Sequence, residues 1–137
     1  MATSPVPVLV QKPSRGLLQL QNGTLSGTLY TGGSNGTKIT GLLITSTDTS
    51  AQTVTVNIVN GGISYPLCTI SIPIGAGTVA GTPAINVMSS ANMPGLPVDA
   101  TGTPYFFLAS ASDTITMTAG AITAGKYIYG ISVAGDF

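Results

Sequence analysis

The chain has 137 residues, which suits a single domain, and only 6% of them are charged, against about a quarter in an ordinary soluble domain. It has no histidine and one cysteine, and four basic residues balance four acidic ones. These numbers argue against an imidazole base, a Ser-His-Asp triad or a thiolate metal cluster, so we expect no enzyme and no cofactor. The balance of charges leaves no basic surface that would attract nucleic acid, so we expect no nucleic-acid partner.

The first segment, residues 1–16, contains three of the nine prolines, which favour extended backbone and prevent a helix. It also holds Lys12 and Arg15, half of the cations. We therefore expect an extended N-terminal arm, which is either a frayed terminus or a segment that becomes ordered against a neighbouring subunit. No basic residue precedes its short apolar run, so a secretory signal is not expected.

From residue 17 onward, short apolar runs with a period of two alternate with Gly, Pro and Asn, a pattern typical of antiparallel strands. The clearest strand is 53–58. The Asn-Gly-Gly sequence at 60–62 predicts a type I′ hairpin that pairs this strand with the next, at 67–74. A strand at 38–46 precedes them after a short turn, and we expect the three to form a meander.

Four further apolar runs bring the total to at least seven strands. This number suits an all-β fold, an antiparallel two-sheet β-sandwich that is jelly-roll-like, in a single domain at 17–137. In the last strand Tyr127 and Tyr129 share a face, and we expect them to pack within the sheet rather than stack on bases or sugars. The four further runs lie at 25–31, 105–108, 113–118 and 126–133.

A long excursion at 75–104 contains five glycines, four prolines and no extended strand pattern. Its apolar side chains argue against disorder, because they must pack either on the body of the domain or on another subunit. We predict four partner-contact residues, two in the arm and two in the excursion: Lys12, Arg15, Met93 and Leu96.

No catalytic, cofactor-binding or metal-ligating residue is predicted. We expect Asp48 to close a turn rather than bind calcium, since no second acid lies near it in the sequence. Asp99 and Asp113 precede turn residues and are expected to be turn acids, and a glycoside-cleaving pair formed by them is the weakest alternative. Cys68 lies on a strand face with isoleucines and is expected to behave as a small buried apolar group.

The surface is expected to promote association of copies. The mean hydropathy is +0.45, but the longest apolar stretches are a few residues, short of the ~20 that a membrane-spanning helix needs. The chain has 20 threonines and 13 serines, and its net charge is zero. Little electrostatic repulsion keeps such copies apart, so we expect a homo-oligomer, a dimer or a trimer, and no membrane partner.

Four stretches carry a resemblance to a known group of proteins: LYTGGSNGTKITGLLITSTDTSAQTVTVNIVNGG, SYPLCTISIPIGAG, LPVDATGTPYFFL and AGKYIYGISVAGDF. Together they span most of 29–137, and they resemble small β-rich virion proteins of tailed bacteriophages that decorate or cement the capsid. The resemblance implies a non-enzymatic protein that is made in the bacterial cytoplasm, is located on the capsid surface and binds the major capsid protein.

Two other functions stay open at this point. A tail, baseplate or fibre-associated virion protein would be present in few copies, and fibres often show repeats or heptads, which this chain lacks. A carbohydrate-binding adhesin module would be expected to display an exposed aromatic platform. The chain has no tryptophan, which counts against that reading.

Overall fold

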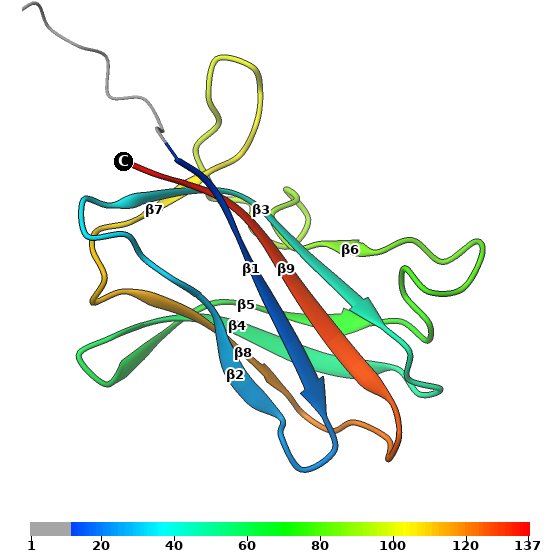
Figure 1. Ribbon diagram of the computed structural model, residues 1–137. Helices are drawn as coiled ribbons and strands as arrows, with labels where there is room; N and C mark the ends of the chain where they lie inside the picture. The colour runs from blue at the N-terminus through cyan, green and yellow to red at the C-terminus, as the bar shows by residue number, and fades with distance from the viewer. Residues whose placement is uncertain (1–11) are drawn as a thin grey trace, which may run out of the picture.

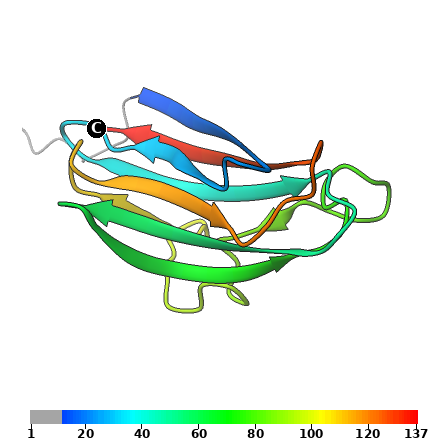
Figure 2. The ribbon, with the colours of Figure 1, turned by 90° about the horizontal axis from the view of Figure 1, so that it is seen from below.

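The structure, a computed structural model, describes residues 12–137, which form two antiparallel β-sheets packed one on the other (Figure 1, Figure 2). No helix occurs in these residues. The predicted all-β two-sheet sandwich is confirmed. Sheet A has the order β1 (Lys12–Gln21), β9 (Tyr127–Asp136), β3 (Thr37–Ser46) and β6 (Ile85–Asn86), with β7 (Phe106–Leu108) also paired to β3. Sheet B has the order β2 (Ser26–Thr31), β8 (Thr114–Ala119), β4 (Gln52–Asn60) and β5 (Ile63–Ile72).

The hydrophobic core lies between the two sheets. Alternate residues of a strand point to opposite faces, so the period of two in the sequence places one set of apolar side chains inside. Each large aliphatic side chain that is buried there contributes roughly 1.5–3 kcal/mol. Among the fully buried side chains are Leu20, Ile39, Leu42, Ile44 and Ile128 from sheet A, and Val54, Val56, Ile72, Ile115 and Met117 from sheet B.

The predicted hairpin between β4 and β5 is confirmed. Asn60 is opposite Ile63, and the two turn residues, Gly61 and Gly62, have φ angles of 58° and 78°. Positive φ at both central positions defines a type I′ turn, and glycine adopts it without steric cost. Strand β5 begins at residue 63, four residues before the predicted start, because pairing with β4 continues directly from the turn.

The expected meander is wrong, because β3 and β4 lie in different sheets. Strand β3 pairs with β9, β6 and β7, whereas β4 pairs with β5 and β8. Residues 47–51 therefore cross from one sheet to the other. Local alternation tells which face of a strand is buried, but it does not tell which sheet the strand joins, and a connection of this length suits a hairpin or a crossover.

Part of the expected arm belongs to the sandwich. Residues 12–16 form the first half of β1 and pair in register with β9, from Lys12 opposite Asp136 to Gly16 opposite Ser132. The sequence there lacks apolar alternation, so only the long-range pairing makes it a strand. Pro13 is tolerated because β1 is an edge strand of sheet A. The rest of the expected arm, 1–11, lies outside the described residues.

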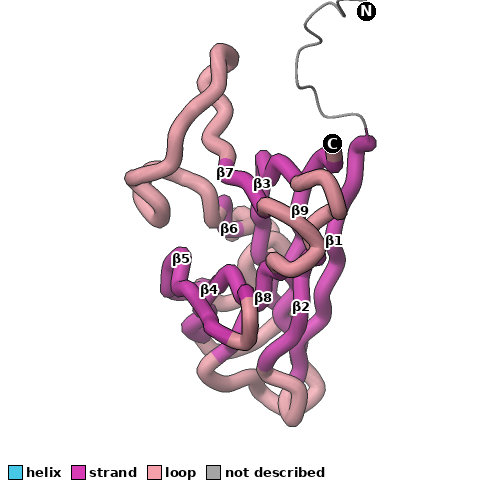
Figure 3. Tube along the Cα trace, turned by 90° about the vertical axis from the view of Figure 1, so that its left-hand side faces the viewer, coloured by secondary structure: helices cyan, strands magenta, loops and turns pink. Residues whose placement is uncertain are grey.

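Part of the excursion at 75–104 packs on the body of the domain, whereas the loop that leads into β7 projects away from the strands (Figure 3). Its short strand β6 pairs with Leu43 and Ile44 of β3. Val87 and Met88 are fully buried in the core, and Met93 is buried beside them. Of the two possibilities that the sequence leaves open, packing on the body therefore accounts for these three side chains. Val98, by contrast, is exposed.

Gly16 lies where β1 passes close to β2 of the other sheet. Its N–H donates a 2.7 Å hydrogen bond to Ser132 Oγ, and a Cβ at this position would lie 1.9 Å from the carbonyl oxygen of Leu29. The change Gly16→Ala should therefore lower the free energy of unfolding by about 1–3 kcal/mol or more, because backbone atoms must move apart. Urea unfolding measures this.

The matched control is Gly95→Ala, since no atom lies within 4 Å of a Cβ at that position. It should change the free energy of unfolding by no more than about 0.5 kcal/mol. Equal effects of the two changes would contradict the close approach of Gly16 to β2.

Candidate docking surface

The outer face of sheet B is rich in hydroxyl groups. The register places Thr55 beside both Thr69 and Thr118, and Ser26 beside Thr118. The hydroxyls of Thr55 and Thr69 are 3.0 Å apart, as are those of Ser26 and Thr118. Such pairs hydrogen-bond to one another and to water, so this face is well suited to remain in solvent.

The outer face of sheet A is apolar. Along β9 the even-numbered residues, such as Ile128 and Ser132, are buried inside, so the odd-numbered ones point outward. The register places Leu17 of β1 and Leu43 of β3 on either side of Ile131. The side chain of Leu17 is 63% exposed. We define the apolar face by six residues that project from this side of the sheet: Leu17, Leu43, Phe107, Tyr129, Ile131 and Val133.

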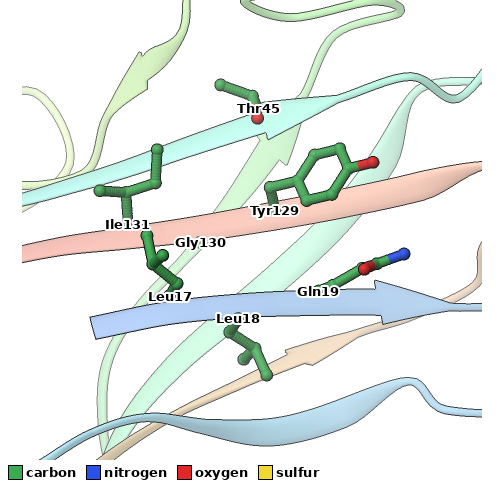
Figure 4. A pocket seen from close by; sticks show the side chains of 7 residues that line it. All are labelled: Leu17, Leu18, Gln19, Thr45, Tyr129, Gly130 and Ile131. Carbon is green, nitrogen blue, oxygen red and sulfur yellow. The ribbon is translucent and has the colours of Figure 1, made fainter.

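The apolar face contains a shallow hollow of about 370 Å³ above the backbone of Gly130 (Figure 4). Five of its lining side chains lie on one side of the sheet, namely those of Leu17, Gln19, Thr45, Tyr129 and Ile131. Leu18 points to the other side. The hollow carries no charged side chain among its lining residues. It can therefore accept an apolar side chain from a partner without removing water from an ion.

Aromatic rings border the apolar face at both ends. At one end Phe107 packs against Tyr105, with ring centroids 5.3 Å apart, and against Phe137 at 6.2 Å. At the other end Tyr127 and Tyr129 stack at 5.9 Å. Tyr127 and Tyr129 thus contact each other within the sheet, as expected, but they do so on its outer side. Aromatic rings of this kind are enriched at protein interfaces.

The structure places the four predicted partner-contact residues in two separate regions. Lys12 and Arg15 are exposed on β1, and Arg15 lies opposite Val133, directly beside the apolar face. Met93 is 7% exposed and Leu96 is half-buried, and both pack against the core. The two lie beside a second hollow, of about 320 Å³, in the excursion. A contact between any of the four and a partner stays a prediction.

The apolar face is not among the features predicted from the sequence, although the sequence contains a signal for it. Strand β9 has apolar residues at both its odd and its even positions, including Ile128, Tyr129 and Ile131. A strand with two apolar faces is usually covered on both sides. In this sandwich sheet B covers one side of β9, so the other side lacks a cover within the described residues.

Asp48 has the structural role that its sequence predicts. Its side chain is 1% exposed and accepts four hydrogen bonds, from the Ser50 N–H, Gln52 Nε2, and the N–H and hydroxyl of Thr123, at 2.7–3.0 Å. Burial alone raises the pKa of this carboxyl, but the hydrogen bonds outweigh it and lower the pKa to about 2. The carboxylate therefore joins the β3–β4 crossover to the β8–β9 loop.

The other acids also serve local structure. Asp99 accepts bonds from the Thr101 hydroxyl and the Thr103 N–H, which lower its pKa, and it lies 3.7 Å from Lys38 Nζ. Asp113 binds different partners, Asn60 Nδ2 and the Ala109 N–H. Asp99 and Asp113, the two acids that a glycoside-cleaving pair would need, therefore bind different partners and do not bind each other.

Asp136 accepts hydrogen bonds from the hydroxyls of Tyr30, at 2.8 Å, and Thr37, at 2.6 Å.

Cys68 is half-buried, and burial raises the pKa of its thiol. Residues 12–137 contain no group of three His, Cys, Asp or Glu side chains that could hold a metal ion. No helix in this part of the chain is long and apolar enough to span a membrane.

No protein-family model matches the sequence, and no curated protein does either. Among solved structures, a chain of the cyanophage Pam1 capsid asymmetric unit is 13% identical, with a TM-score of 0.48, and the match covers 98% of this chain and 91% of that one. The Drosophila NLP core, described by its pentamer formation and histone binding, is 12% identical, with a TM-score of 0.46 over 92% of this chain and 98% of that one.

A chain of Bacillus endospore appendages, which are disulfide-linked pili, is 14% identical. Its TM-score is 0.44, and the match covers 98% of this chain and 99% of that one. The neighbours thus include capsid and pilus proteins, which build assemblies. Because every one of these TM-scores lies below 0.5, the likenesses carry no argument about function.

The carboxylate of Asp48 makes stability depend on pH. Its pKa is lower in the folded chain than the ordinary value of 3.8. The contribution of this carboxylate to the free energy of unfolding is therefore complete above about pH 4 and is lost as the pH falls towards 2. Asp48→Asn should lower the free energy of unfolding at pH 7 by about 1–3 kcal/mol, because the amide leaves N–H or O–H donors without an acceptor. It should also flatten the loss of stability between pH 4 and 2.

Asp113→Asn is the matched control, since its hydrogen bonds lie in an exposed region. This change should lower the free energy of unfolding at pH 7 by less than Asp48→Asn does. Thermal unfolding followed by circular dichroism measures both changes, and an Asp48→Asn variant as stable as the Asp113→Asn variant would contradict the bridging role.

Proposed function

We propose that this chain is a non-enzymatic structural protein of a tailed-bacteriophage virion, and that it decorates or cements the capsid by binding the major capsid protein. The observation that carries the proposal is the difference between the two outer faces of the sandwich. Sheet A presents Leu17, Ile131 and Val133, whereas sheet B presents threonine hydroxyls. The sequence resemblance to phage decoration proteins supports the same role.

A protein that coats a shell needs one face that binds and one that stays in water. Large contiguous apolar patches are uncommon on soluble monomers and mark interaction sites. Each Å² of apolar surface that docking removes from water contributes roughly 25 cal/mol, of which part is offset by the lost freedom of the bound chain. Sheet A fits the side that faces the shell, and sheet B the side that faces solvent.

The repeating lattice of a capsid would make modest contacts sufficient. When copies associate into a dimer or a trimer, binding of one copy raises the effective concentration of the next at its own site. Low charge assists this arrangement, since copies that carry no net charge repel one another little. We propose the segment 1–11 and the region of Met93 and Leu96 as secondary contacts with neighbouring subunits.

The change Leu17→Gln tests the docking face. Leu17 is exposed, so the variant should fold normally, but its affinity for isolated shells of the encoding phage should fall by about fivefold or more, since an apolar contact is replaced by an amide. Co-sedimentation with shells, at a series of protein concentrations, measures the affinity. Thermal unfolding checks the fold.

Ile63→Gln provides the matched control. Ile63 is 58% exposed, which is close to the value for Leu17, but it belongs to β5 in sheet B. This variant should bind shells as the unchanged chain does. If both variants bound shells equally, or if only Ile63→Gln weakened binding, sheet A would not be the docking face.

A further inference from the structure

The neutral chain distributes its charges unevenly. All four aspartates have partners in the chain: Asp48 in the crossover, Asp99 beside Lys38, Asp113 beside Asn60, and Asp136 beside Tyr30 and Thr37. None of these carboxylates is among the six residues of the apolar face, although Asp99 borders it through Lys38, the register partner of Phe107. The negative charge of the chain is therefore used inside its own loops and strand ends, although the sum of charges is zero.

The cations are placed differently. Lys38 is held by Asp99 and lies 4.8 Å from the centre of the Tyr105 ring. Lys12 and Arg15 are exposed on β1, and neither has an ion-pair partner among residues 12–137. Arg15 is two residues from Leu17 on the same side of the strand, and its register partner is Val133. One guanidinium group thus lies at the border of the apolar face.

Docking of the apolar face would remove water from this guanidinium. A charge that loses water without gaining a partner is costly, so a tight contact requires an acceptor opposite Arg15. A carboxylate matches the planar fork of an arginine with two parallel hydrogen bonds. Phosphate polymers and anionic lipid surfaces are bound through many cations at once, and this edge presents only two.

We propose that the surface which docks on the apolar face is a protein surface that presents an apolar patch and, beside it, a carboxylate that pairs with Arg15. Lys12, three residues earlier in β1, lies on the other side of the strand. This inference rests on the proposed function and specifies the chemistry of the partner. It implies that the contact has a fixed orientation, since Arg15 borders the β1 side of the face without an ion-pair partner among residues 12–137, whereas Lys38, opposite Phe107 on the other side, is already held by Asp99.

Charge changes at Arg15 test the inference in the full chain. At about 0.05 M salt, Arg15→Gln should weaken binding to shells of the encoding phage by about two- to fivefold, and Arg15→Glu by about tenfold or more, because like charges would then meet. Both differences should shrink as salt rises towards about 0.5 M, since salt screens exposed charges. Co-sedimentation at each salt concentration measures the affinities.

The matched control is Lys126→Glu, which changes the net charge by the same amount as Arg15→Glu does. Lys126 precedes β9, at the opposite end of the strand from the pair formed by Arg15 and Val133. The affinity of the Lys126→Glu variant for shells should lie within about twofold of that of the unchanged chain, as expected for a charge outside the contact. The Arg15 variants should show the thermal unfolding of the unchanged chain, because Arg15 is exposed, and the same measurement checks that Lys126→Glu, at a half-buried residue, is folded.

The possible outcomes separate the two proposals. If Arg15→Glu bound shells as Lys126→Glu does, the carboxylate partner would be wrong, while binding by the unchanged chain would keep the decoration role. If duplex DNA or phosphatidylserine vesicles bound the chain as tightly as shells do and competed with them, the partner would be a phosphate-bearing surface. Failure of the unchanged chain to bind shells would overturn both proposals.

Discussion

The pairing of β9 with two strands that are distant in sequence is the constraint on which the rest of the structure depends. Strand β9, the last described strand, lies between β1 and β3 and pairs with both of them, so it holds these two strands in one sheet. A shift of one residue in this register would exchange its two faces. The apolar core and the apolar outer face are therefore set by the same pairing.

Polar side chains secure this arrangement at specific points. Ser132 on β9 accepts the N–H of Gly16, where β1 passes close to β2. At the end of the strand, Asp136 accepts hydrogen bonds from Tyr30 and Thr37 and so connects β9 to both sheets. No buried side-chain polar atom lacks a hydrogen-bond partner among the described residues. The aspartates thus stabilise the fold through partners within the chain, whereas Lys12 and Arg15 stay exposed on β1.

The sequence predicts the local features well and the long-range ones poorly. Period-two alternation and the Gly61-Gly62 turn are local, and they correctly identify the sandwich and the β4–β5 hairpin. The sheet that β3 joins depends on β9, which lies some eighty residues later, so no local pattern could reveal it. Strand pairing of residues 12–16 depends on the same distant partner.

The candidate site shows the same division. The charge of Arg15 predicts a role in partner contact, and the structure places this residue beside the apolar face. The sequence alone does not predict that Leu17 and Leu43 face outward, because an apolar residue on a strand is ordinarily assigned to the core. The register shows that both lie on the outer side of sheet A. Because Met93 lies in an irregular segment, the sequence predicts that it contacts a partner, yet this part of the segment packs on the body and buries it.

These features combine into one account of the molecule. A sandwich with one hydroxyl-rich face and one apolar face can lie flat on a larger surface, and the cationic edge at β1 would set its orientation there. Affinity would come from repetition of this contact around a lattice rather than from any single strong site. The account therefore depends above all on the protein being present in many regularly placed copies.

Copy number per virion tests that claim most directly. Quantitative mass spectrometry of purified particles of the encoding phage would compare this chain with the major capsid protein. The account predicts one copy per shell subunit or a simple fraction of that number. A handful of copies per particle would contradict it and indicate a place at the tail or at a single vertex, and complete absence from the particle would contradict a virion role altogether.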